Sequence, residues 1–474
     1  MARLRARRWP LPVVIVLSAI LFSSTSTAEL FRTAISPVVQ DGLINKASTQ
    51  CPVAQDGYTY NTFPWTHYPT CVKVILPAGD GEDLGVHQTF CAYSNTNYNG
   101  GRGVSFVVSP EVASSISFES FGMAVGGSED QIGEEMGIWE VLETDDRGKG
   151  LFARKDLGKI FAGDDLIIKT PALLISRQLL ETPSTTRRDF VLSTAFEQLP
   201  EDTRQVLKNL AKSWGGSEAV DIIKTNGIDV HWPWVDEVPQ LLAVTPEIAR
   251  INHACRPNAM WRFNDYTLAF DVFALKEIQP GEEITLSYGY EKRSHGRRTR
   301  SLQANHNFSC LCSLCTASPA EIEASNDRLA DIKAVKSILP TDPADSPQLL
   351  GLLSNLIKLY DDEDLHTETP MYEEILAYTW SSFGIPDRAK YWAGRARQHW
   401  AVLMGKESWE AKRCGDLENN VKAHATWMTW EGDPWEGALE EGHPWEERED
   451  NDHAGGQDEG YAHREDEKEN LKRF

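Results

Sequence analysis

The segment from Arg250 to Cys315 contains the motifs that decide the fold. It begins with the polar run Arg250-Ile251-Asn252-His253-Ala254-Cys255-Arg256-Pro257-Asn258-Ala259. It continues with Gly281-Glu282-Glu283-Ile284-Thr285-Leu286-Ser287-Tyr288 and ends with Phe308-Ser309-Cys310-Leu311-Cys312-Ser313-Leu314-Cys315. An Asn-His pair, a strand-like run that ends in tyrosine, and a compact group of cysteines therefore follow one another in that order.

The clustered cysteines Cys310, Cys312 and Cys315 predict a metal site. They are too crowded to form disulfides with one another, but their spacing suits one soft cation. Tetrahedral zinc takes four nitrogen or sulfur ligands, so a fourth ligand has to come from elsewhere. Cys255 is the nearest candidate in sequence, and we expect these four cysteines to hold Zn²⁺.

Together these motifs resemble those of the SET-domain protein lysine methyltransferases. That family has N-H-x-C-x-P-N, then G-E-E-[IL]-x-x-x-Y, then F-x-C-x-C-x-x-C. A Gly-x-Gly turn lies upstream, and here it matches Arg147-Gly148-Lys149-Gly150-Leu151-Phe152-Ala153. A lone Gly-x-Gly is weak evidence, but four ordered elements are specific. The resemblance implies methyl transfer from S-adenosylmethionine to a lysine of a protein or peptide substrate, histone or non-histone.

The resemblance also assigns roles to individual residues. Tyr288 is the expected catalytic residue, whose hydroxyl orients the amine and contacts the methyl group. The expected cofactor contacts are Gly148, Lys149, Gly150, Asn252, His253 and Phe308. Ala254 stands where serine is commoner, and His306 stands where relatives often have a second pocket tyrosine. No zinc-finger cluster follows Gly150, so the chain is similar to the SET-and-MYND class without its MYND finger.

Length, composition and net charge limit the domain number and the kinds of binding partner that are expected. The 474-residue chain is longer than one ordinary domain, and its hydrophobic content of 41% suits packed cores. The formal net charge of -23 argues against a direct nucleic-acid partner. The acidity suits a basic partner, but it can equally serve to keep the protein soluble. The sequence makes no prediction of the oligomeric state.

The first 28 residues have the pattern of a cleaved secretory signal peptide. A basic start precedes the apolar run 11–22, and small residues then allow cleavage after Ala28. The apolar run is shorter than the ~20 residues of a spanning helix, so no membrane span is expected beyond this leader. An uncleaved anchor and an organellar presequence are alternatives. SET enzymes usually act in reducing compartments, so the nucleus or cytoplasm also stays open.

The predicted fold class is multidomain: a β-rich SET fold with short sheets, a pseudoknot implied by the resemblance, and a helical insert. A small β-rich module precedes it and an α-helical domain follows it. The predicted boundaries are 1–28 for the signal peptide, 29–130 for the module, 137–290 for the SET domain with its insert at about 184–225, 291–317 for the post-SET zinc loop, 318–430 for the helical domain and 431–474 for an acidic disordered tail.

Several features leave alternatives open. Outside the predicted metal site, the remaining cysteines are Cys51, Cys71, Cys91 and Cys414; one pair is expected within 29–130, and the remaining cysteine is a candidate to bridge to Cys414. The basic run 291–300 suits an acidic partner or a nuclear address, but a solvated helix face is the preferred interpretation. Trp232 and Trp234 either line a peptide groove or pack in a core.

The sequence also contains a glycosylation signal that conflicts with an enzymatic function. The only Asn-x-Ser/Thr sequon, Asn307-Phe308-Ser309, lies on the expected adenine and zinc loop, where a glycan would block the site. The rival function is therefore a secreted or lumenal, non-catalytic binding protein built on a SET scaffold.

Overall fold

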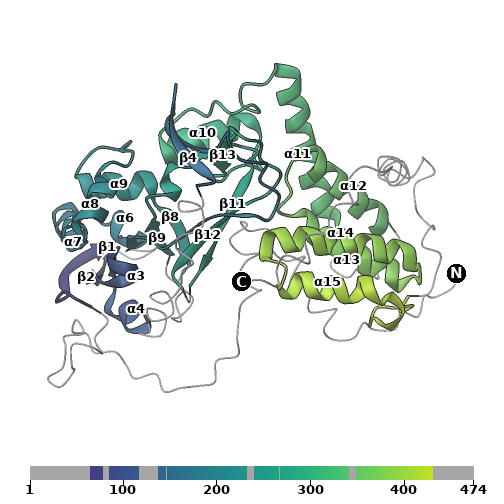
Figure 1. Cartoon of the computed structure of the whole chain (residues 1–474), viewed down its shortest axis with the longest axis horizontal. Helices are drawn as coiled ribbons and strands as arrows, with labels where there is room; N and C mark the ends of the chain where they lie inside the picture. Colours follow the sequence, from purple (N-terminus) through teal and green to yellow (C-terminus); the bar gives the residue numbers. More distant parts are fainter. Residues whose placement is uncertain are drawn as a thin grey trace. The chain divides into compact units, whose positions relative to one another are not determined.

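A computed structural model describes residues 65–77, 85–116, 137–231, 240–340 and 348–430, with 146 and 266 left out. The chain divides into two compact units, and Figure 1 shows the elements of each. The first unit comprises residues 38–326, and the second comprises 327–474 together with 1–37. The predicted signal peptide, the acidic tail, Cys51 and the two tryptophans of 232–234 lie outside the described residues.

The largest sheet of the first unit has six strands in the order β1-β2-β3-β7-β9-β8. Their bounds are β1 (Thr70–Leu76), β2 (Val86–Asn95), β3 (Val104–Val108), β7 (Leu173–Ser176), β9 (Gln240–Val244) and β8 (Ile228–His231). β3 pairs with β7 in parallel, and the other neighbours are antiparallel. Every residue of β3 is buried, because both faces of this central strand are covered.

This sheet corrects the predicted domain boundary near residue 130. Strands β1, β2 and β3 lie within the predicted β-rich module, but they do not form a separate unit. Ser105 of β3 lies opposite Leu173 of β7, so strands from both sides of the predicted boundary share one hydrogen-bonded sheet. The prediction was wrong because strand patterns report local structure and carry no information about which distant strand is the partner.

Two smaller sheets complete the β structure of the first unit. The four-stranded sheet has the order β10 (Asn252–His253), β13 (Glu283–Leu286), β5 (Gly148–Ala153) and β4 (Trp139–Thr144). The three-stranded sheet has the order β11 (Ala259–Asn264), β12 (Ala269–Ala274) and β6 (Asp165–Lys169). The Gly-x-Gly turn thus begins β5, which pairs with β4 in an antiparallel hairpin.

The predicted helical insert is also present and covers one face of the six-stranded sheet. It consists of α7 (Thr185–Glu197), α8 (Glu201–Lys208) and α9 (Glu218–Asn226), preceded by the short α6 (Arg177–Glu181). Val191, Ala195 and Phe196 of α7 pack in one core with Val107 of β3. The alternate residue Phe106 belongs to the core on the other face, as the two-residue period of a strand requires.

The glycine-rich run 98–103 fixes the segment that leads into the Asn252 motif. Asn99, Gly100, Gly101 and Gly103 all have positive φ angles. The turn lets Arg102 form a bidentate pair with Glu247, with Nη1–Oε1 and Nη2–Oε2 distances of 2.8 and 2.6 Å. The pair is largely shielded from solvent, with 19% and 15% of the two side chains exposed.

Within the described residues, Cys71 and Cys91 form the disulfide that the sequence predicted inside 29–130. They lie directly opposite each other in β1 and β2, at a Cα–Cα distance of 4.0 Å. The predicted bridge to Cys414 is wrong, because Cys414 is a free thiol in the core of the helical unit.

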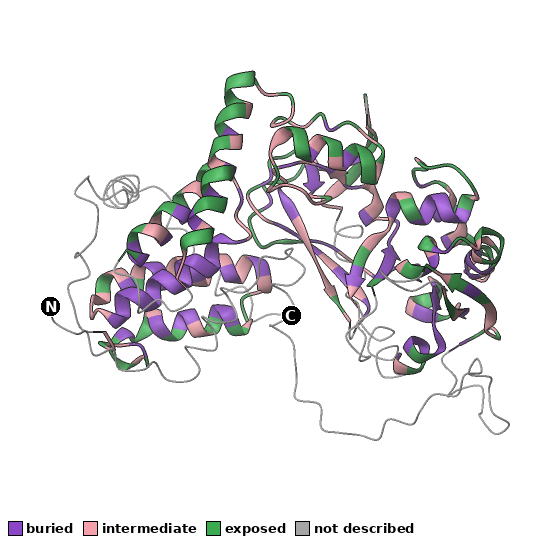
Figure 2. Ribbon diagram, turned by 180° about the vertical axis from the view of Figure 1, so that it is seen from behind, coloured by how far each residue is buried: buried purple, intermediate pink, exposed green. Residues whose placement is uncertain are grey.

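The second unit is helical, as predicted. Its helices are α12 (Leu349–Asp362), α13 (Thr369–Ser382), α14 (Pro386–Met404) and α15 (Trp409–Asn419), preceded by α11 (Pro319–Ile338), within which the division of the chain falls. All residues of α13 are buried, as Figure 2 shows in purple. None of the helices among the described residues is long and apolar enough to cross a membrane.

We predict that Glu247→Gln lowers the free energy of unfolding by about 3–5 kcal/mol, because the guanidinium of Arg102 would stay buried without its counter-charge. Burial opposes ionisation of Glu247, but the hydrogen bond and charge of Arg102 outweigh it and lower the pKa of the carboxyl. The loss should therefore be complete above about pH 4.3 and shrink as the pH falls through the folded-state pKa.

Urea denaturation at several pH values measures this difference. Glu277→Gln, which breaks the exposed Lys159–Glu277 pair, is the matched control and should change stability little. A difference between Glu247→Gln and the wild type that is independent of pH would contradict the prediction.

Candidate active site and metal centre

The pairing of β10 with β13 brings the separate sequence motifs together. Asn252 lies opposite Thr285 and His253 opposite Leu286, in parallel register. The buried side chain of Asn258 fixes this arrangement: its Oδ1 accepts from the Thr285 N–H at 2.8 Å, and its Nδ2 donates to the Glu283 carbonyl oxygen at 2.9 Å. The last Asn of the first motif is therefore a structural residue that joins that motif to the second.

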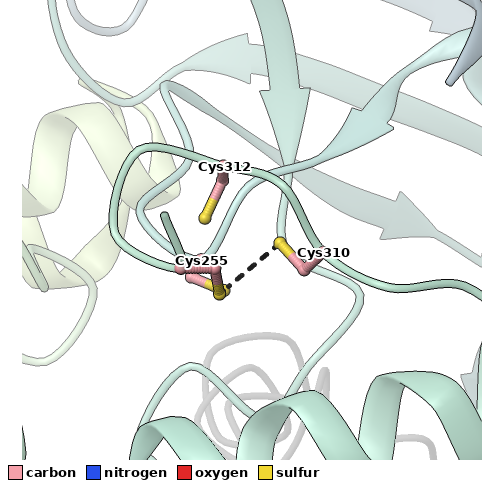
Figure 3. A group of neighbouring side chains, drawn as sticks. Cys255, Cys310 and Cys312 are labelled. Atoms are coloured by element: carbon pink, nitrogen blue, oxygen red, sulfur yellow. Dashed lines mark hydrogen bonds between the residues drawn. The ribbon is translucent and has the colours of Figure 1, made fainter. Parts of the chain in front are cut away.

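The four predicted metal ligands do meet. Figure 3 shows the thiol groups of Cys255, Cys310 and Cys312 turned toward one another. The Sγ atom of Cys255 lies 3.8 Å from that of Cys310 and 3.5 Å from that of Cys315. All four Sγ atoms lie within 4.8 Å of one another. Cys255 and Cys310 are buried, and Leu302 packs against them.

This geometry fits a tetrahedral zinc ion. A Zn–S bond of about 2.3 Å implies an S–S separation of about 3.8 Å in a regular tetrahedron. The Cys255–Cys310 and Cys255–Cys315 separations of 3.8 and 3.5 Å are close to that value. Mutual hydrogen bonding lowers the pKa of Cys312 and of Cys315, the latter to about 7, and raises the pKa of Cys255 and Cys310, so two of the four thiols favour the thiolate form that a metal binds. The four cysteines would therefore hold Zn²⁺ and fix the post-SET loop to the first motif.

His253 connects this cluster to Tyr288. Its Nδ1 accepts a hydrogen bond from the Tyr288 backbone N–H at 3.0 Å, so the ring proton is on Nε2. Nε2 lies 3.3 Å from the Sγ atom of Cys255 and is placed to donate to it. Burial lowers the pKa of His253 to about 4, so the ring is neutral near pH 7. The side chain of His253 thus joins the backbone of Tyr288 to the thiol of Cys255.

Tyr288 lies at the centre of an aromatic group. Its ring centroid is 5.3 Å from those of His253 and His306 and 6.0 Å from that of Phe308. Its hydroxyl donates to the Ile251 carbonyl oxygen at 2.7 Å, although 37% of the residue remains exposed. Burial of the phenol, followed by the negative charge of Glu283, raises the pKa of Tyr288. The hydroxyl is therefore protonated at neutral pH and acts as a donor.

His306 takes part in the same group. It ends α10 (His295–His306), and its ring lies 6.2 Å from that of Tyr290 and 6.3 Å from that of Phe308. Burial lowers the pKa of His306, so it presents a neutral ring beside Tyr288. The position where relatives often have a pocket tyrosine is thus occupied by an uncharged aromatic group here.

The Gly-x-Gly turn approaches Asn252 closely. Gly148 has a φ of +70°, which favours glycine, and begins β5. A Cβ on Gly150 would lie 2.7 Å from Oε1 of Glu283 and 3.0 Å from Nδ2 of Asn252. The same amide donates to the Lys149 carbonyl oxygen at 3.3 Å. The residues predicted to contact the cofactor on the two motifs therefore lie side by side.

Two residues of this region were missed by the sequence reasoning. Glu283 accepts from Asn252 Nδ2 at 2.9 Å and from Arg147 Nη2 at 2.6 Å. The sequence signal for Glu283 is its place as the second Glu of the Gly-Glu-Glu motif. The signal for Arg147 is its position directly before Gly148. The carboxylate of Glu283 orients the Asn252 amide, which is a polar group available to a ligand.

Removal of metal should destabilise the first unit and release the post-SET segment, because the four thiols would lose their common ligand. We predict one zinc per chain by elemental analysis, and a stabilisation of about 4 kcal/mol when free zinc exceeds its dissociation constant by about a thousandfold. Cys312→Ser should lose the metal, whereas Cys414→Ser, which removes the buried thiol of the helical unit, should retain it. Equal metal content in these two variants would refute the assignment.

Comparison with known proteins supports the similarity seen in the motifs. The family described as SET domain matches residues 148–289. Mouse protein-lysine N-trimethyltransferase SMYD5 is 41% identical over 69 residues, which cover 14% of this chain and 17% of that protein. Histone-lysine N-methyltransferase set5 of Schizosaccharomyces pombe is 33% identical over 79 residues, which cover 17% of this chain and 25% of that protein.

The matched segments therefore span a quarter or less of the length of these two relatives. A solved structure of the SET domain of LSMT bound to lysine and AdoHcy aligns at 13% identity over 76% of this chain and 98% of that chain. Its TM-score of 0.25 is too low to carry an argument. The family match rests on residues 148–289, which contain the Gly-x-Gly turn, Asn252 and Tyr288. Residues 148–289 therefore match the SET domain family, and the motifs in this segment are similar to those of the protein-lysine methyltransferases.

Proposed function

We propose that the chain transfers the methyl group of S-adenosylmethionine to the side-chain amine of a lysine in a protein substrate. The observation that carries the proposal is the convergence of Gly150, Asn252, Tyr288 and Phe308 around the β10–β13 pair. The two relatives, a protein-lysine and a histone-lysine methyltransferase, support lysine as the acceptor.

The reaction requires a neutral amine. Free lysine has a pKa near 10.4, so its nitrogen lone pair is occupied by a proton at neutral pH. Burial of the side chain in an aromatic site lowers that pKa by desolvation, and a positively charged sulfonium lowers it further. The proton leaves to solvent, the C–N bond forms as the S–CH₃ bond breaks, and methyl-lysine and S-adenosylhomocysteine are the products.

Tyr288 orients the amine in this proposal. Its hydroxyl is protonated at neutral pH, so it is not the base that takes the lysine proton. The oxygen keeps acceptor capacity for an amine N–H while its own proton is bonded to the Ile251 carbonyl. The neutral rings of His306 and Phe308 beside it would complete an apolar wall that keeps the amine desolvated.

The predicted cofactor contacts follow the same arrangement. Gly148, Lys149 and Gly150 would present backbone groups to the amino acid end of the cofactor. Asn252 offers its amide edge, which Glu283 orients. Phe308 would pack on the adenine, and the metal centre would hold it in place through Cys310 two residues further on. His253 would contribute its backbone while its ring bonds to Tyr288 and Cys255.

A direct test incubates the purified full-length protein with radiolabelled S-adenosylmethionine and a panel of histones and other lysine-rich proteins. Label is expected on lysine of one class of substrate, identified by mass spectrometry of tryptic peptides. A wild-type protein that binds zinc but neither binds S-adenosylhomocysteine nor transfers label would refute the proposal.

Tyr288→Phe should reduce kcat by about 10²-fold or more, because one preorganised polar contact to the reacting amine is lost. Affinity for S-adenosylhomocysteine should change little, since Phe keeps the ring that packs against Phe308. Tyr68→Phe is the matched control, because Tyr68 is 76% exposed and distant in sequence from the site motifs. Unchanged kcat in Tyr288→Phe would exclude the role assigned to the hydroxyl.

Gly150→Ala should weaken binding of S-adenosylhomocysteine about tenfold or more, because the methyl group would displace the Asn252 amide and the Glu283 carboxylate. Isothermal titration calorimetry measures the affinity. Gly158→Ala is the control, since a Cβ there meets nothing within 4 Å and no positive φ is required. Equal affinities of the two variants would show that this close approach is unrelated to the cofactor.

The rival function, a secreted or lumenal non-catalytic protein, is favoured by one specific observation. The Cys71–Cys91 disulfide suits an oxidising compartment, which agrees with the predicted signal peptide. Asn307 is exposed, and its Nδ2 donates to the Ser213 carbonyl at 2.6 Å, so a glycan there would lie between the post-SET segment and the α8–α9 connection. Mass spectrometry of the natively expressed protein separates the cases: a glycan on Asn307 with no methyl transfer supports the rival.

A further inference from the structure

Arg298 is a fully buried arginine in a helix that the sequence predicted to be a solvated basic face. It lies in α10 and only 1% of it is exposed, while its neighbours Arg297 and Arg300 are exposed. Figure 2 shows the exposed outer face of this helix. The preferred interpretation of the basic run is therefore correct for Arg297 and Arg300 and wrong for Arg298.

The guanidinium of Arg298 has no carboxylate partner among the described residues. Its Nη1 donates to the Arg293 carbonyl oxygen at 2.7 Å, and its Nε has no hydrogen-bond partner. The well-shielded arginines elsewhere do have one: Arg102 pairs with Glu247, and Arg413 with Glu374. A buried unpaired charge costs several kcal/mol, so a negative group that is not a carboxylate is expected near Arg298.

The surroundings of Arg298 identify that group. Leu302 follows it by four residues, hence on the same face of α10, and packs against Cys255 and Cys310. The carbonyl oxygen of Glu291, two residues before the Arg293 carbonyl that Arg298 contacts, accepts a hydrogen bond from Nη1 of Arg256 at 3.1 Å, and Arg256 directly follows Cys255.

We propose that Arg298 is the counter-charge of the metal–thiolate centre formed by Cys255, Cys310, Cys312 and Cys315. Four thiolates carry more negative charge than one divalent ion neutralises, so the loaded centre remains anionic. The guanidinium supplies positive charge from α10, and the Nε2–H of His253 supplies a hydrogen bond from β10. The proposal rests on the metal centre described above and is independent of methyl transfer.

The coupling between Arg298 and the metal is reciprocal. Without metal, the thiols lose most of their negative charge and the buried guanidinium is left uncompensated. Without Arg298, the anionic centre is left in an apolar setting with less compensation, and metal release becomes easier. Arg298 is therefore a positioning residue for the metal centre and does not contact a substrate.

The test measures zinc affinity of the full-length protein by competition with a chromogenic chelator. Arg298→Met, which keeps the length and removes the charge, should weaken zinc binding about 10- to 100-fold, as is typical when a group that supports the ligands is lost. Arg297→Met, one residue away and exposed, should bind zinc as the wild type does. The loss in Arg298→Met should persist in 0.5 M NaCl, because buried charges are poorly screened.

Arg298→Lys separates charge from shape. Arg298→Lys should retain more zinc affinity than Arg298→Gln. The comparison of these two variants also tests the counter-charge if Arg298→Met does not fold. Equal zinc affinity of Arg298→Met and wild type, or of the lysine and glutamine variants, overturns the proposal. A wild-type protein that binds no zinc overturns it together with the metal centre, whereas a protein that binds zinc but lacks methyl transfer leaves the counter-charge supported and refutes only the enzymatic function.

Discussion

The two-residue pairing of β10 with β13 is the contact on which the rest of the site depends. It joins segments more than thirty positions apart, at Asn252 with Thr285 and at His253 with Leu286. Such a short parallel pair is weak by itself, and Asn258 reinforces it with hydrogen bonds from both ends of its amide. Tyr288 and the cysteine cluster owe their proximity to this one crossing of the chain.

Much of the site could be predicted because each motif combines a chemical type with a fixed spacing. Three cysteines at C-x-C-x-x-C admit few uses other than a metal, and Cys255 is the nearest candidate in sequence for the fourth ligand. The strand and helix positions followed from alternation and from helical spacing. These patterns involve residues that are close in sequence, so they can be recognised without knowledge of the tertiary structure.

The pairing of distant strands and the burial of particular charged residues could not be predicted, because they depend on tertiary contacts. The partner of β3 is β7, some seventy residues later, and nothing in either strand specifies the other. Arg298 has neighbours in α10 with the same side chain, and only the packing of Leu302 against the cysteines distinguishes it. Likewise, the buried Glu373 and Glu374 of α13 interrupt an apolar pattern, yet they are matched by Arg395, His399 and Arg413 from other helices.

The disulfide of β1 and β2 has a consequence for how the chain matures. Among the described residues, the first unit contains one oxidised cysteine pair and four free thiols. Because Cys315 has a pKa of about 7, part of it is thiolate at neutral pH, the form that attacks disulfides. A bound metal would keep these thiolates from exchanging with the Cys71–Cys91 pair. The order of metal binding and oxidation therefore bears on how the native cysteine pattern is reached.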